Sequence, residues 1–127
     1  MNVTLHGRRQ HFRSVTFATA RNAVHLIDQR LLPHEFKVVA LADYRATALA
    51  IREMVVRGAP AIAATAAYGL AQGARDFRGR SLRQFARHVR RVYEALKHAR
   101  PTAVDPVNAM DEVLTRMSAG ETVPEQQ

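Results

Sequence analysis

The sequence predicts an α+β domain in which a small antiparallel sheet of about three strands packs on about four helices. Before residue 43, short apolar stretches rich in β-formers are separated by turn signals; after it, apolar residues recur at helical spacing. A chain of 127 residues can bury about two-thirds of its unfolded surface. The chain has no cysteine, so we expect one apolar core without disulfides or thiolate metal sites.

Three strands are predicted in the first third of the chain, at residues 14–18, 23–28 and 36–41. Residues 19–22 suit a hairpin turn, and Leu32-Pro33-His34 marks a bend before the third strand. Residues 1–13 are basic and weakly patterned, which fits a loose arm or an irregular strand. We therefore place the domain at residues 14–120 and expect the polar tail, residues 121–127, to be frayed.

Four helices are predicted after the strands, each with a start signal. The first covers residues 44–54, with Asp43 as its N-cap, and the second runs from Pro60 to about Gly73. The second is apolar or small almost all round, so we expect it to be buried. Ser81 caps the third, whose buried stripe comprises Leu82, Phe85, Val89, Val92, Tyr93 and Leu96. Asp105 and the following proline begin the last, which ends near residues 118–120.

The junction between the first two helices has the features of an anion site. Gly58 breaks the first helix, and Pro60 suits the first turn of the second. Free N–H groups, the helix dipole and the Arg57 guanidinium would together favour a phosphate or carboxylate. A tight helix–helix corner is the alternative interpretation of the same residues.

Arg100 lies at a second helix junction. If the fold brings it near Arg57, two guanidiniums and a helix N-terminus would converge on one anion. Two other roles remain open: Arg100 could cap carbonyl groups of its own helix, or pair with Asp105.

Four segments of the chain are similar to those of a known enzyme family. Arg57-Gly58-Ala59-Pro60-Ala61-Ile62, leading into residues 66–71, resembles the signature of the S-methyl-5-thioribose-1-phosphate isomerases. Residues 26–33, 50–54 and 100–104 resemble an early strand and turn, the helix before the pocket, and a second substrate-contacting segment. The resemblance covers roughly residues 15–118. The wider superfamily includes ribose-1,5-bisphosphate isomerases and the regulatory subunits of the eukaryotic initiation factor 2B exchange factor.

The resemblance implies a role in substrate anchoring. Family enzymes convert methylthioribose-1-phosphate to methylthioribulose-1-phosphate in methionine salvage, without a cofactor. It also implies that Arg57, Gly58, Ala59 and Arg100 bind the substrate. The catalytic cysteine and aspartate belong to the family's Rossmann-like second domain, which we expect to be absent here. We therefore assign no catalytic residue.

This chain departs from the family's usual pattern at two places near the implied site. Ala63 stands where the family usually has glycine, and Asp105 stands where it usually has asparagine. The family also usually has an aromatic residue near Asn108, and this chain has none there. A carboxylate beside a phosphate pocket would repel substrate unless Arg100 neutralised it.

The formal charge of +8 raises nucleic-acid binding as an alternative function. Much of the charge lies on one face of the third long helix, at Arg83, Arg87, Arg90, Arg91, Lys97, His88 and His98. A solvated face is the preferred interpretation, because no nucleic-acid-binding motif accompanies these residues. The six histidines show no zinc-enzyme spacing, so no metal is predicted. No apolar run is long enough to span a membrane, and residues 1–13 resemble no secretory signal, so a cytoplasmic location is expected.

Three interpretations of the short chain remain open: a fragment, one half of a split enzyme, or a stand-alone regulatory or protein-interaction module of the superfamily. The expected partners are a phosphorylated sugar and either a separate catalytic domain or further copies of this chain. Exposed apolar surface would favour such association.

Overall fold

The computed structural model describes residues 2–5, 8–11, 13–100 and 104–127. Its three-stranded antiparallel sheet has the order β3-β4-β5 and comprises β3 (Val15–Ala18), β4 (Ala23–Ile27) and β5 (Val38–Leu41). Val24 of the central strand lies opposite Phe17 and Leu41. Where an arm or irregular strand is predicted, β1 (Asn2–Leu5) pairs antiparallel with β2 (Arg8–His11).

Four long helices follow the sheet: α1 (Tyr44–Arg52), α2 (Ala59–Arg75), α3 (Leu82–Ala99) and α4 (Asp105–Met117). The predicted α+β class is therefore confirmed. Two predicted caps are present: the side chains of Asp43 and Ser81 accept from Ala46 N at 2.8 Å and Gln84 N at 3.3 Å. The hairpin turn between β3 and β4 is a short 3-10 helix, η1 (Thr19–Arg21).

The C-terminal tail differs from the frayed segment that its polar composition suggests. It forms a short helix, α5 (Val123–Gln126), whose Val123 is 2 % exposed within the core. The Gln127 side chain also donates to the carbonyl groups of Ala74 and Phe77, each at 2.9 Å. The buried Val123 side chain and these two bonds hold the tail against the C-terminal end of α2. The local composition of the tail does not reveal this packing.

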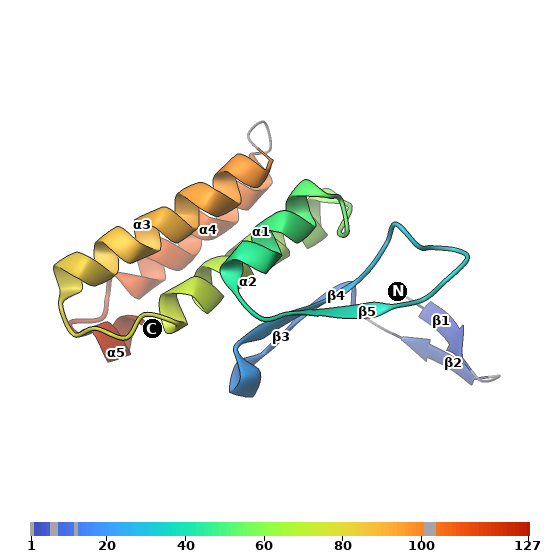
Figure 1. The fold of residues 1–127 in the computed structure, drawn as a ribbon, viewed down its shortest axis with the longest axis horizontal. Coiled ribbons are helices and arrows are strands. Elements are labelled where there is room, and N and C mark those ends of the chain that lie inside the picture. The colour runs from blue at the N-terminus through green and yellow to red at the C-terminus, as the bar shows by residue number, and fades with distance from the viewer. Residues whose placement is uncertain (1, 6–7, 12, 101–103) are drawn as a thin grey trace.

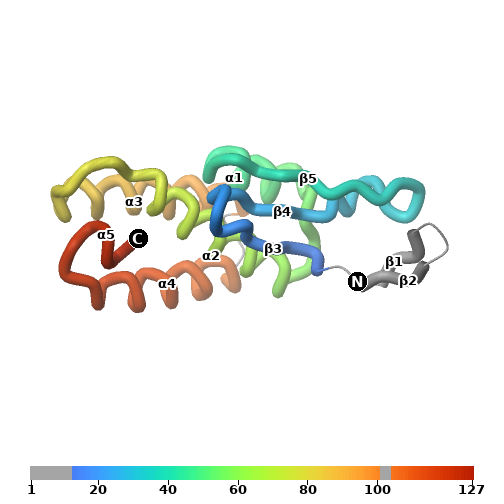
Figure 2. Tube along the Cα trace, turned by 90° about the horizontal axis from the view of Figure 1, so that it is seen from below, coloured from blue at the N-terminus to red at the C-terminus, as the bar shows by residue number. Residues whose placement is uncertain are grey.

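Helix α2 lies at the centre of the core. Figures 1 and 2 show an elongated molecule with the three-stranded sheet towards one end, α3 and α4 towards the other, and α2 running between α3 and α4. α2 contacts α1, α3 and α4, and also β3 and β4. Gly69 and Gly73 allow this: a Cβ built on Gly73 would lie 2.6 Å from both methyl groups of Val92. The predicted burial of this helix follows from its small residues.

Gln72 connects the helices to the sheet through a buried polar network. Its side chain is fully buried, and its Nε2 donates to the carbonyl groups of Asn22 at 3.0 Å and Leu41 at 2.8 Å. The Thr47 hydroxyl donates to its Oε1 at 2.7 Å. Gln72 thus joins α2 to α1, to the turn before β4 and to the end of β5, and every polar atom of the amide has a partner.

Candidate functional site

The connection between α1 and α2 begins with a Schellman-type turn. Met54 N donates to Ile51 O at 3.2 Å, and Val55 N donates to Ala50 O at 3.0 Å. Met54 has a φ of +62°, in the left-handed position usually taken by glycine. The turn ends α1 two residues before the predicted boundary and buries Val55 and Val56.

A charged cluster fastens this connection to the end of β4. Gln29 N donates to Val55 O at 2.9 Å. Arg30 makes two side-chain bonds to Asp28, at 3.0 and 2.9 Å, and lies 3.5 Å from Glu53. The hydrogen-bonded Arg30 guanidinium holds the pKa of Asp28 below its ordinary value, although burial alone would raise it. Local sequence gives little sign of this cluster beyond an acid and an arginine two residues apart after a strand.

Helix α2 presents an uncapped N-terminus. Its N-cap, Gly58, has a φ of +91° and no side chain to accept from the first turn. The carbonyl of Gly58 accepts the first helical bond, from Ile62 N at 2.9 Å. Within the described chain, the N–H groups of Ala59 and Ala61 make no hydrogen bond, and Pro60 has none to offer. This helix start therefore has free donors and a favourable dipole for an anion.

Three of the four predicted substrate-binding residues lie together. Gly58, Ala59 and Arg100 line a hollow of about 300 Å³, together with Ile62, Val104, Asp105 and Pro106. The hollow lies between the N-termini of α2 and α4. Arg57 is exposed beside Gly58 but is not among the lining residues. Binding of an anion there stays a prediction.

Neither alternative role of Arg100 is found in the described part of the chain. Its backbone N–H donates to Lys97 O at 3.3 Å, but its side chain caps no carbonyl group and forms no ion pair with Asp105 within 4.0 Å. The guanidinium is thus available to a ligand in the hollow. Residues 101–103 of the second resembling segment lie outside the described residues.

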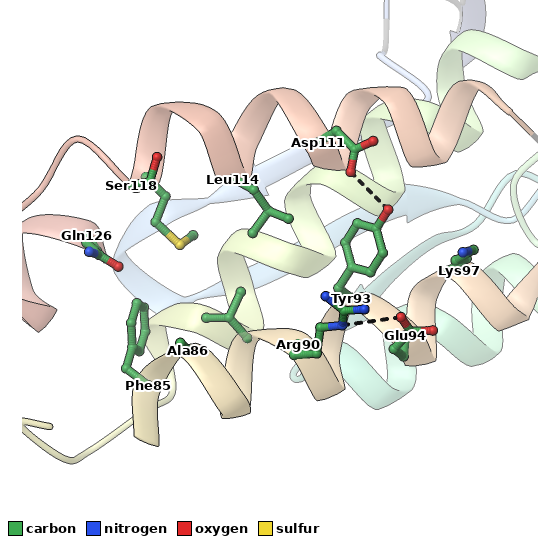
Figure 3. Close-up of a pocket in the computed structure, with 12 residues that line it drawn as sticks. Phe85, Ala86, Arg90, Tyr93, Glu94, Lys97, Asp111, Leu114, Ser118 and Gln126 are labelled. Atoms are coloured by element: carbon green, nitrogen blue, oxygen red, sulfur yellow. Dashed lines mark hydrogen bonds and ion pairs between the residues drawn. The ribbon is translucent and has the colours of Figure 1, made fainter. Parts of the chain in front are cut away.

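A larger hollow, of about 450 Å³, lies between α3 and α4 and contains none of the predicted site residues. Figure 3 shows the charged side chains gathered around Tyr93, which points toward Asp111, while Leu114, Phe85 and Ala86 lie toward the other end of the hollow. The Tyr93 hydroxyl donates to Asp111 at 2.9 Å. The pKa of the phenol is raised, chiefly by burial and secondly by the hydrogen bond to this carboxylate. Arg90 and Glu94, which also line this hollow, lie 3.5 Å apart. Because the lining contains both cations and carboxylates, the hollow favours neither an anionic nor a cationic ligand.

Other site types have little support in the described ranges. No group of three histidine, cysteine or acidic residues there could hold a metal ion. The described helices include none with the length and hydropathy needed to cross a membrane.

Comparisons with known proteins identify a family and individual relatives. The chain matches the Initiation factor 2 subunit family over residues 55–127. A methylthioribose-1-phosphate isomerase of Synechocystis sp. is 51% identical over 89 residues, which are 70% of this chain and 25% of that protein. The corresponding protein of Fervidobacterium nodosum is 43% identical over 107 residues, 83% of this chain and 31% of the relative.

Two solved structures have the same fold. The 5-methylthioribose 1-phosphate isomerase of Pyrococcus horikoshii matches with a TM-score of 0.78 and 38% identity, over 84% of this chain and 30% of that one. The delta subunit of translation initiation factor eIF-2B from A. fulgidus matches with a TM-score of 0.82 and 32% identity, over 91% and 33%. The chain thus spans about a quarter to a third of the length of these relatives. Sequence motifs, fold and relatives agree, and the chain belongs to the Initiation factor 2 subunit family.

Proposed function

We propose that this chain anchors the phosphate group of a methylthioribose-1-phosphate-like sugar in the hollow between α2 and α4. The observation that carries the proposal is the guanidinium of Arg100, which has no acidic partner among the described residues and lines the same hollow as Gly58 and Ala59 at the start of α2. A guanidinium attracts a phosphate through its charge, and the free N–H groups at the positive end of a helix dipole attract it as well.

The role of Arg57 differs from that of Arg100. Arg57 is exposed and forms no ion pair with any described residue, so its guanidinium is free to fold over a ligand from outside the hollow. Asp105 opposes binding, since it places a carboxylate in the lining. The two positive charges of Arg57 and Arg100 outnumber the one negative charge of Asp105, so the net charge of these three side chains still favours an anion.

The proposed contribution to isomerisation is orientation of the sugar. A clamp on the phosphate reduces the orientations of the substrate, which can lower a barrier by several kcal/mol in favourable cases. The names of the relatives supply the reaction class, isomerisation of methylthioribose-1-phosphate. We assign no proton transfer to residues of this chain, so we expect binding without turnover.

The test is a calorimetric titration of the purified chain with methylthioribose-1-phosphate and, separately, with inorganic phosphate, with the ketose product assayed in the same samples. Arg57→Ala and Arg100→Ala should each weaken binding by about tenfold to a hundredfold, the value of one charge-assisted hydrogen bond. Arg116→Ala is the matched control, because Arg116 is exposed near the far end of α4 and pairs with Glu112 at 3.1 Å.

The outcomes separate the hypotheses. Saturable binding that both site variants weaken and the control does not would support anchoring. Equal weakening by Arg116→Ala would reduce the effect to overall charge and contradict the proposed site. Absence of binding in the wild-type chain would favour the second candidate, a regulatory or interaction module, for which the similarity to the eIF-2B delta subunit is the specific observation.

A further inference from the structure

A second hollow, of about 360 Å³, lies between α1 and α3 and shares no residue with the proposed phosphate site. We call it the α1–α3 groove. Its lining consists of three basic side chains and four small or aliphatic ones: Arg45, Ala48, Leu49, Arg52, Ala95, His98 and Ala99. The groove therefore combines positive charge with apolar surface, and its lining has no carboxylate.

The two arginines are available to a ligand. Arg45 and Arg52 are seven residues apart on α1, so they share one face of the helix. Both are exposed, and neither forms an ion pair with another described residue. The Arg45 guanidinium carbon lies over the Tyr44 ring, 5.4 Å from its centroid, which is a cation–π contact and leaves the charge uncompensated by an acid. His98 lies 3.6 Å from the carboxylate of Glu94, so it is less available to a ligand than the two arginines are.

The floor between the arginines is apolar and accessible. Leu49 lies four residues after Arg45 and three before Arg52, and 51% of its surface is exposed. Ala95 and Ala99 of α3 face it across the groove. A half-exposed leucine between two arginines that have no acidic partner among the described residues offers an apolar contact and two charge-assisted bonds within two turns of helix.

We propose that the α1–α3 groove docks an acidic, amphipathic segment of a partner protein. Carboxylates of such a segment would bond to the two arginines while an apolar side chain covers Leu49. Charge complementarity favours a partner other than a second copy, because each copy has a net charge of +8. Nucleic acid fits less well, because the lining has no aromatic ring for base stacking and phosphates leave Leu49 uncovered.

The test uses a fluorescein-labelled helical peptide with glutamates on one face and leucines on the other, followed by fluorescence anisotropy. Arg45→Glu/Arg52→Glu should weaken binding at least about tenfold, and Leu49→Ser at least about threefold. Arg83→Glu/Arg87→Glu is the matched control, since it reverses two exposed charges on α3 that do not line the groove. Far-ultraviolet circular dichroism verifies that each variant is folded.

Three results would overturn the proposal. Absence of saturable peptide binding would exclude the docking surface, and equal loss in the control would show that only overall charge attracts the peptide. Tighter binding of a single-stranded DNA 12-mer, lost in Arg45→Glu/Arg52→Glu but unchanged in Leu49→Ser, would identify a nucleic-acid surface instead. Groove variants that still bind sugar phosphate would separate this surface from the phosphate site.

Discussion

Replacing Gln72 with leucine tests whether the buried polar network holds the sheet on the helices. Leucine has a similar volume but cannot bond to the Asn22 and Leu41 carbonyl groups or accept from Thr47. Each orphaned carbonyl costs about 1–1.5 kcal/mol, whereas the single proton of the Thr47 hydroxyl can turn to Asp43 O, 3.2 Å away. We expect a loss of about 3 kcal/mol in the free energy of unfolding, which lowers Tm by about 10 °C.

Urea unfolding followed by circular dichroism measures this loss. The matched control is Thr65→Val, in the same helix and equally buried, whose hydroxyl bonds only to Ala61 O of its own helix, at 2.7 Å. We expect the control to cost less than about 1 kcal/mol. If Gln72→Leu lowers the free energy of unfolding no more than Thr65→Val does, the Gln72 bonds between helix and sheet add nothing to stability beyond a local side-chain bond. That result would refute the reasoning. In Thr47→Val/Gln72→Leu the loss should be less than the sum of the single changes.

Three further changes address the α1–α2 connection. Gly58→Ala should destabilise the fold by about 1–2 kcal/mol in urea unfolding, because no atom lies near the new Cβ and only the φ of +91° opposes it; a neutral result would contradict that cause. Met54→Gly should stabilise by about 1 kcal/mol, since glycine adopts the φ of +62° without strain; a fall in Tm would indicate that the exposed Met54 side chain contributes more than its backbone costs. Arg30→Met should raise the pKa of Asp28 towards its ordinary value of 3.8. Because the wild-type pKa is depressed, the stability that this pair provides is present above about pH 4 and lost as pH falls through the native pKa. The wild-type and variant unfolding energies should therefore differ at neutral pH and converge in acid; a constant difference would assign the effect to packing.

Most of the secondary structure could be predicted because its signals are local. Asp43 and Ser81 cap the helices that follow them through bonds to residues three positions ahead. The predictions were less accurate where a distant contact decides the conformation. Helix α1 ends at Arg52, two residues before the prediction, and Gln29 N donates to Val55 O in the turn that follows it. The tail is ordered by contacts between Gln127 and the end of α2.

The candidate site was only partly predictable for the same reason. The motif around Gly58 predicts a helix start with free N–H groups, and the sequence also points to Arg100 as a possible second cation. Their meeting in one hollow depends on the packing of α2 against α4, which brings together segments far apart in the chain. Arg57 lies outside the lining although it directly precedes Gly58 in the chain.

By itself, the sequence determined the α+β class, the approximate helix starts and the family resemblance, because caps, periodicity and motifs each involve residues within a few positions of one another. Only the tertiary structure decided which charges remain unpaired and which face a hollow. Arg30 is bound to Asp28 and Glu53, whereas Arg45, Arg52, Arg57 and Arg100 have no acidic partner in the described chain. The pairing of a charge depends on distances across the folded molecule, and these are fixed when the small residues of α2 allow α1, α3 and α4 to pack around it.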